Sequence, residues 1–238
     1  MSSNGATPMN EKENQTRYSD NLPPAGGHED VQPRPVLPVA TKRVATPAGL
    51  GLISFATDIF LISIYGLQAR GIQNPNIMVG MLVAFGGLCQ FLAGIMEFVN
   101  RNTFGATVFC SYAALNWSYA LIYIPGSGIM SAYTDANGAL SPEFNQAVSI
   151  YMWVWFIISV LFTVAAYKST WIVFIDMISV DLCLLLLACG FMVSNQSVLT
   201  AGYSFGMVAC FLSYWAGCSA MWADTTPIKL PMFQISRV

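Results

Sequence analysis

Residues 86–112 read GGLCQFLAGIMEFVNRNTFGATVFCSY, and this stretch determines the class of the protein. One apolar run ends at the polar segment 100–103, and a second apolar run follows it directly. Two membrane-spanning helices joined by a tight turn produce this pattern. Gln90 and Glu97 interrupt the first run, although hydrocarbon tolerates such side chains only where they face protein or water. Both residues therefore call for a structural or functional explanation.

The composition of the whole chain agrees with a membrane protein. Of its 238 residues, 55% are hydrophobic and only 9% are charged, whereas about a quarter of a soluble domain is charged. The net charge of −2 gives no basic field that would attract nucleic acid. The sequence thus predicts an all-α integral membrane protein in contact with lipid, with no nucleic-acid partner.

Six apolar segments follow a polar N-terminal region, and each approaches the ~20 residues that a helix needs to cross a bilayer. They predict a six-helix transmembrane domain at 46–224, with helices near 47–69, 77–99, 104–124, 147–167, 171–193 and 199–223. Residues 1–45 are rich in polar residues, Pro and Gly, and we expect a disordered tail there. Residues 225–238 form a second, short tail.

The distribution of lysine and arginine between the two sides of the membrane indicates the orientation of the protein. With six spans, nine of the ten basic residues lie on one side, and Arg70 alone lies on the other. The positive-inside rule then places both termini in the cytoplasm, and we expect a multi-pass protein of the plasma membrane. The nine residues are Lys12, Arg17, Arg34, Lys42, Arg43, Arg101, Lys168, Lys229 and Arg237.

The sequence carries no recognisable catalytic or metal site. The P-loop and HExxH motifs are missing, and the single histidine, His28, lies in the N-terminal tail. All six cysteines fall in apolar runs and none forms a CxxC pair, which favours small buried side chains over metal ligands. We therefore expect no enzyme activity and no cofactor, and passage of a solute through the bundle is the default function.

Four carboxylates lie inside or near the apolar runs. Asp58 and Asp181 fall near mid-bilayer, where an aspartate costs at least about 2.5 kcal/mol on insertion scales. We interpret them, with Glu97, as candidates for proton coupling. The alternative is a structural hydrogen bond between helices. Glu97 and Asp176 lie toward the cytoplasmic helix ends, where a local partner such as Arg101 or Lys168 would also explain them.

Gln90 shares one helical stripe with Gly87, Gly94 and Glu97, at offsets of three, seven and ten residues. Gly80, Gly87 and Gly94 are seven residues apart on this helix. A helix face made of small residues allows another helix to approach closely. The stripe fits either a polar line along a solute pathway or a tightly packed seam with one interhelical hydrogen bond.

Several segments resemble the acetate uptake transporter family, also called the Gpr1/Fun34/YaaH family. TPAGLGL at 46–52 is similar to the family signature NPAPLGL, and the other matching segments are GGLCQFLAGIMEF at 86–98, NTFGAT at 102–107, Ser111-Tyr112 and GCSA at 217–220. The resemblance covers about 45–231, and the long tail is similar to that of fungal members. It implies a six-helix protomer with its own pore in a hexameric ring. It further implies passage of acetate or a related short monocarboxylate with a proton, or ammonium export in some fungal relatives.

The resemblance also implies roles for individual residues. The family's apolar constriction matches Phe55, Tyr112 and Val180. Its cytoplasmic entrance motif matches Thr46, Pro47, Gly49 and Leu50, although Thr46 and Gly49 replace the signature's Asn and second Pro. We place these four residues, with Gln90 and Asn116, on the substrate pathway.

Two further departures bear on the substrate. An aromatic pair of the family is replaced here by Leu115-Asn116, and Asp58 and Asp181 stand where uncharged polar residues are expected. Ionised aspartates beside the constriction would repel an anion. The leading hypothesis is therefore proton-coupled acetate transport, with two alternatives: an ammonium or proton-linked export pathway, and a membrane sensor or scaffold that has lost transport.

Overall fold

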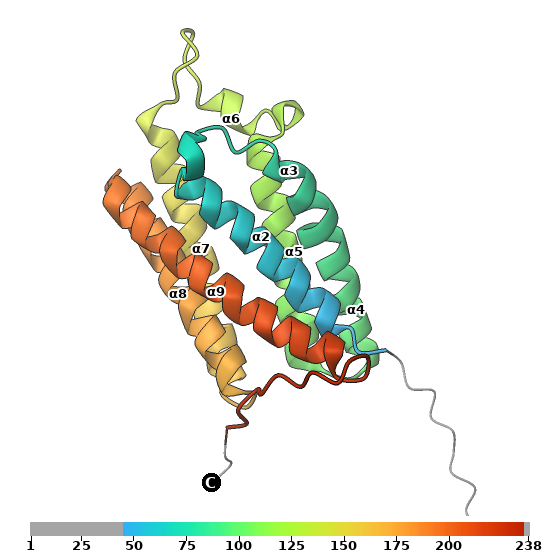
Figure 1. Cartoon of the computed structure of the whole chain (residues 1–238). Helices are drawn as coiled ribbons and strands as arrows, with labels where there is room; N and C mark the ends of the chain where they lie inside the picture. Colours follow the sequence, from blue (N-terminus) through green and yellow to red (C-terminus); the bar gives the residue numbers. More distant parts are fainter. Residues whose placement is uncertain (1–44, 236–238) are drawn as a thin grey trace, which may run out of the picture. The chain divides into compact units, whose positions relative to one another are not determined.

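The computed structural model describes residues 45–235, so the expected tail at 1–45 lies outside it except for its last residue. The described part is built of helices (Figure 1). In chain order they are α2 (Ala48–Gly66), α3 (Met78–Met81), a π-helical segment (Leu82–Cys89), α4 (Gln90–Val99), α5 (Thr103–Tyr123), α6 (Ile129–Ala132), α7 (Pro142–Ala166), α8 (Trp171–Met192) and α9 (Gln196–Trp222). Two short 3₁₀ turns, Ala69–Gly71 and Pro125–Ser127, complete the set.

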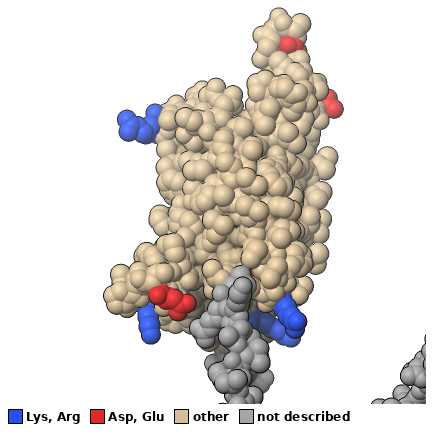
Figure 2. All heavy atoms as spheres, turned by 90° about the vertical axis from the view of Figure 1, so that its right-hand side faces the viewer, with Lys and Arg blue, Asp and Glu red and all other residues tan. Residues whose placement is uncertain are grey.

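Five helices of the described residues are long and apolar enough to cross a membrane: Ala48–Gly66, Met78–Val99, Pro142–Ala166, Trp171–Met192 and Gln196–Trp222. The second of them joins α3, the π-helical segment and α4 into one continuous helix. The protein is thus a multi-pass membrane protein. The face drawn in Figure 2 agrees, because its charged side chains lie near the two ends and leave an uncharged band between them.

Helix α5 is the sixth long helix in the described residues, with 21 residues. It is not among the five apolar spans, because Asn116, Ser118 and several tyrosines lower its hydropathy. Most of its middle is nevertheless buried against other helices. A helix surrounded by protein can carry polar groups that a lipid-facing helix cannot. The polar composition of α5 thus follows from its interior position.

Polar caps explain where several helices begin. Asn102 accepts the backbone N–H of Gly105 at the start of α5, and Thr170 accepts that of Val173 at the start of α8. Helix α7 begins at Pro142 rather than at the expected residue 147, because Ser141 is its N-cap and proline suits the first helical position. Helix α9 begins at Gln196 rather than at 199, because Asn195 caps it. In both places polar residues extend the helix beyond its apolar run.

Small residues allow the long helices to pack closely. Helix α9 lies against both α2 and α8, α8 also packs on α7, and α4 packs on α5. A Cβ added at Gly87 would overlap the Trp117 ring of α5, and one at Gly94 would lie 2.9 Å from the backbone nitrogen of Cys110. Gly217 of α9 meets the backbone of Ile53 on α2 in the same way, at 3.2 Å. Gly87, Gly94 and Gly217 thus lie at contacts between helices of this chain.

The π-helical segment at Leu82–Cys89 is a feature that the sequence pattern does not reveal. Trp117 Nε1 of α5 donates a hydrogen bond to the carbonyl oxygen of Val83, within this segment, over 3.1 Å. The same segment brings Gly86 against Asp58 and Asn116, where a Cβ would overlap the Asp58 carboxylate. The π turn therefore shapes the middle of the bundle.

The C-terminal segment after α9 returns along the end of the bundle instead of leaving it. The Trp171 backbone nitrogen donates to the Phe233 carbonyl oxygen over 2.9 Å, and Trp215 Nε1 donates to that of Pro231, also over 2.9 Å. An isolated antiparallel bridge joins Thr170 to Gln234. This segment consequently holds the turn between α7 and α8 in place.

We predict that Gly94→Ala destabilises the protein and that Gly80→Ala does not. The new Cβ at Gly94 would press on the α5 backbone at Cys110, and overpacking costs about 1–3 kcal/mol. A Cβ at Gly80 would have no described atom within 4 Å, so Gly80 provides the control. Unfolding midpoints in detergent measure the effect, and equal midpoints for the two variants would contradict the close α4–α5 contact.

Candidate functional site

Three cavities follow one another through the helical bundle. We call them the proximal cavity, of about 380 Å³, the central cavity, of about 60 Å³, and the distal cavity, of about 210 Å³. Phe55 and Tyr112 line both the proximal and the central cavity, and Ile62 and Tyr119 line both the central and the distal cavity. The shared residues place the cavities in series, with a constriction at each junction.

The helical repeat explains this arrangement. On α5, Tyr112, Asn116, Tyr119 and Tyr123 recur at offsets of four, seven and eleven residues, so they occupy one face of the helix. These residues line the cavities in the same order, from the proximal end of the series to the distal end. One continuous face of α5 therefore forms a wall along the series of cavities.

The first constriction is aromatic. The rings of Phe55 and Tyr112 are stacked, with centroids 5.1 Å apart and planes 26° apart, and the Phe162 ring meets Tyr112 edge-on at 5.7 Å. The Tyr112 hydroxyl shares a hydrogen bond of 2.9 Å with Ser159 Oγ of α7. Val180 of α8 lines the central cavity beside both rings. All three residues that the family resemblance assigns to the constriction are thus brought together, and Ser159 joins them.

A chain of buried polar side chains runs beside this constriction. Asn116 Nδ2 donates to Asp58 Oδ2 over 3.2 Å and to Gln90 Oε1 over 3.1 Å. Each of the three side chains is at most 3% exposed. Asp58 and Asn116 line the central cavity, whereas Gln90 lines the proximal one. Asp58 Oδ1 and Gln90 Nε2 have no hydrogen-bond partner among the described residues. Both are unpaired polar atoms inside the bundle.

The second constriction and the distal cavity carry neutral polar groups. Tyr119 and Tyr123 share a hydroxyl–hydroxyl hydrogen bond of 3.1 Å, and their rings meet edge-on. Both line the distal cavity together with Tyr65, Tyr203 and three glutamines, Gln68, Gln73 and Gln196. No charged side chain of the described residues lines this cavity. It can therefore offer hydrogen bonds to a solute without attracting either sign of charge.

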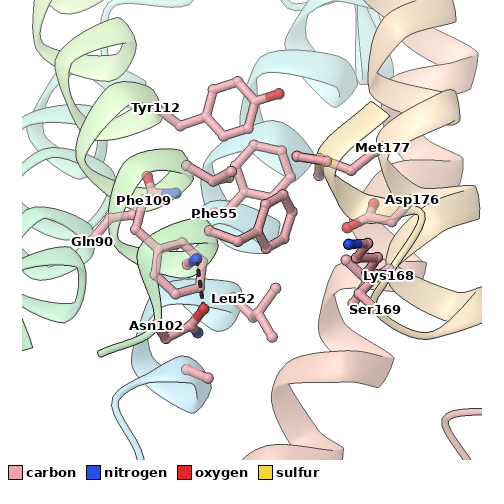
Figure 3. A pocket seen from close by; sticks show the side chains of 16 residues that line it. Leu52, Phe55, Gln90, Asn102, Phe109, Tyr112, Lys168, Ser169, Asp176 and Met177 are labelled. Atoms are coloured by element: carbon pink, nitrogen blue, oxygen red, sulfur yellow. Dashed lines mark hydrogen bonds between the residues drawn. The ribbon is translucent and has the colours of Figure 1, made fainter. Parts of the chain in front are cut away.

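The proximal cavity contains the charged lining residues that sequence reasoning did not assign to a site (Figure 3). Asp176 of α8 is fully buried and accepts a hydrogen bond of 2.6 Å from Ser213 Oγ of α9. Lys168, in the turn between α7 and α8, lines the same cavity. From its position in the sequence Asp176 resembles an acid at a helix end. Its partner Ser213 lies 37 residues away, so no local signal identifies the pair.

Other candidate residues lie away from the cavities. Asp181 is only partly buried and accepts a hydrogen bond of 2.7 Å from Thr163 Oγ1, at the seam between α7 and α8. It lines none of the three cavities. Asp58 and Asp181 therefore have separate partners and no hydrogen bond joins them in the described structure. Glu97 accepts a hydrogen bond of 2.8 Å from Asn102 Nδ2, which ties the α4–α5 turn.

The four residues assigned to the entrance motif line none of the three cavities, although the family resemblance places them on the substrate pathway. Ala48 and Leu52 line the proximal cavity, whereas Thr46, Pro47, Gly49 and Leu50 do not. Gly49 faces Met221 of α9, Pro47 precedes the first residue of α2, and Leu50 is 43% exposed. Gly49 therefore packs α2 against α9, and within the segment 46–52 only Ala48 and Leu52 lie at the cavity wall.

Several curated proteins are similar to this chain. Accumulation of dyads protein 2 of Saccharomyces cerevisiae is 38% identical over 178 residues, which cover 75% of this chain and 62% of the yeast protein. Acetate permease A of Emericella nidulans is 34% identical over 212 residues, covering 86% and 70%. Ammonia transport outward protein 2 of S. cerevisiae is 34% identical over 178 residues, covering 75% and 62%. The matched part spans less than two thirds of both yeast proteins.

The fold is also that of a solved membrane protein. The structure of the bacterial acetate channel SatP matches with a TM-score of 0.68 at 21% identity, over 79% of this chain and all of that chain. The model of the GPR1/FUN34/yaaH family matches residues 27–237. The resemblance carried by the sequence motifs is thereby confirmed, and the chain belongs to the GPR1/FUN34/yaaH family.

Proposed function

We propose that this protein moves acetate or a related short monocarboxylate across a membrane through its three cavities. The observation that carries the proposal is the stacked Phe55–Tyr112 constriction, which joins two cavities inside one bundle. Membership of the family and the similarity to an acetate permease support it. The same support favours a transporter over an enzyme.

The central cavity favours a neutral solute. Its volume of about 60 Å³ accommodates only a few non-hydrogen atoms, so a solute must leave most of its hydration behind. An unpaired charge is very unfavourable in such surroundings. In addition, an ionised Asp58 would oppose an anion by about 4 kcal/mol at ~4 Å and an effective dielectric constant of ~20. We infer that a monocarboxylate crosses as the undissociated acid, so that each molecule carries its own proton.

The arrangement in the membrane is part of the same proposal. We infer that α5 is the sixth spanning helix, packed against α4 and the π-helical segment and also in contact with α2 and α7. The proximal cavity, with Lys168, then faces the cytoplasm by the positive-inside rule, and both termini lie on that side. A plasma-membrane location and assembly into a homohexameric ring, each protomer with its own pathway, complete the proposal. The apolar side chains exposed on α4 and α7 are available for contact with lipid or with other protomers.

Acetate uptake into proteoliposomes tests this function, and Phe55→Trp is the informative variant. The larger indole has to fit where the Phe55 ring already stacks on Tyr112, so we expect uptake to fall at least about tenfold, equivalent to ~1.4 kcal/mol in the barrier. Phe211→Trp is the matched control, because Phe211 is 65% exposed on α9. Wild-type uptake equal to that of protein-free vesicles would exclude the function, and equal rates for both variants would exclude this constriction as the pathway.

A second candidate cargo is ammonium. The buried Asp58 carboxylate, with its unpartnered Oδ1 at the central cavity, is a suitable acceptor for a small cation with several N–H donors. One of the similar yeast proteins is named for outward ammonia transport. In this case the ionised carboxylate would favour the solute instead of opposing it.

Asp58→Asn separates the two cargoes. If the cargo is a carboxylic acid, removal of the carboxylate lets the anion enter, so we expect faster acetate uptake with an acetate-dependent current that the wild type lacks. If the cargo is ammonium, the variant loses methylammonium flux by about tenfold and acetate has no effect. Currents on a solid-supported membrane together with labelled uptake measure both. The exposed Asp224→Asn is the control and should match the wild type.

A further inference from the structure

The proximal cavity contains two charged side chains that the proposed pathway does not yet use. Figure 3 draws Asp176 and Lys168 on the same side of the cavity, with Phe55 and Gln90 elsewhere on its wall. Lys168 is the only cationic side chain of the described residues that lines any of the three cavities. The central and distal cavities therefore provide, within residues 45–235, no positive group that could hold a carboxylate anion.

The position of Asp176 is fixed by its surroundings. Its Oδ2 accepts the hydrogen bond from Ser213 Oγ at 2.6 Å, and the side chain is fully buried. Its Oδ1 has no hydrogen-bond partner among the described residues. A buried carboxylate with a free oxygen at a cavity wall is unfavourable unless a proton, a cation or a solute completes it. This unsatisfied atom indicates a ligand or a proton at the proximal cavity.

Lys168 can reach such a ligand. It lies in the turn between α7 and α8, which the C-terminal segment holds through the bond from Trp171 to Phe233. Lys168 and Asp176 do not form a salt bridge within the described structure, yet both line the same cavity of about 380 Å³. The ammonium group is on a long flexible stem, so a small carboxylate can bind between it and the Asp176 carboxyl.

We propose that the proximal cavity is a proton-exchange site, in which Lys168 binds the carboxylate of the substrate and Asp176 gives a proton to it or takes one from it. This inference rests on the proposed function and deepens it, because it says where the anion in solution becomes the neutral acid that the central cavity accepts. Ser213 is a positioning residue that orients the Asp176 carboxyl.

The exchange is balanced within the cavity. A carboxylate anion binds to Lys168 while Asp176 is protonated. The O–H bond of Asp176 breaks, and an O–H bond forms on the substrate carboxyl. The neutral acid then moves on to the Phe55–Tyr112 constriction, and the Asp176 carboxylate that remains is stabilised by the Lys168 ammonium. A proton from the adjacent solution restores Asp176. A solute that leaves by this end goes through the same steps in reverse.

Few other titratable groups of the described residues face Asp176. Tyr112 approaches it from α5 and Cys210 from α9, while Lys168 is the basic group at the α7–α8 turn. Helix α2 contributes only Ala48, Leu52 and Phe55 to this cavity. Glu97 of α4 is bound to Asn102 and lines no part of the cavity. Lys168 and Asp176 are thus the two groups whose charges suit exchange with a carboxylate.

Two variants test the site, with binding of labelled acetate to purified protein and uptake into proteoliposomes measured over a range of pH. Above the pH at which acetate itself takes up a proton, wild-type binding should weaken as pH rises, because it requires protonated Asp176. Asp176→Asn imitates the protonated form but cannot exchange a proton, so it should bind acetate independently of pH and lose net uptake at least about tenfold. Lys168→Gln, at an exposed position, should weaken binding about tenfold.

Asp224→Asn is the control, because Asp224 is an exposed carboxylate that lines none of the cavities. It should keep the wild-type pH dependence. If the wild type moves acetate but Asp176→Asn retains both the uptake and its pH dependence, the exchange site is wrong and the proposed function stands. The same holds if Lys168→Gln binds acetate as tightly as the wild type. If the wild type moves no acetate, the proposed function itself fails.

Discussion

Tyr112 is the residue on which the arrangement of the pathway depends, because it ties its own helix to two others at once. Its ring stacks on Phe55 of α2, its hydroxyl is bonded to Ser159 of α7, and its position on α5 puts it in both the proximal and the central cavity. A buried hydroxyl needs a partner, and a single partner at 2.9 Å leaves the ring little freedom. The aromatic constriction is therefore held by contacts from two neighbouring helices, at the junction of the proximal and central cavities.

The chemistry of the walls changes in order along the bundle. The proximal cavity has Lys168 and Asp176, the central cavity has Asp58 with Asn116, and the polar side chains described at the distal cavity are neutral tyrosines and glutamines. A solute thus meets ionisable groups at one end and uncharged donors at the other. In the proposed exchange the change of protonation takes place at the charged end, because the narrow central cavity provides no cation, among the described residues, that would hold an anion.

The sequence predicted much of this, and the reasons for the rest are physical. Apolar length located the long helices, and the motif around Tyr112 identified the family. Contacts between distant residues could not be foreseen: Asp58 meets Asn116 across 58 residues, and Tyr112 meets Ser159 across 47. Asp58 and Asp181 both fall near mid-bilayer in the sequence, but no hydrogen bond joins them, because Asp181 is bonded to Thr163 of α7. The π-helical segment also leaves no pattern in composition.

The small volume of the central cavity has a consequence for energetics. A narrow, apolar and closed compartment is where most of a transmembrane voltage falls, and each elementary charge that crosses it exchanges about 2.3 kcal/mol per 100 mV with the field. A solute that passes this compartment without net charge exchanges none. The accumulation of such a solute then follows the pH difference between the two sides of the membrane, whatever the electrical potential of the cell. Its passage does not reduce that potential, on which other transporters depend.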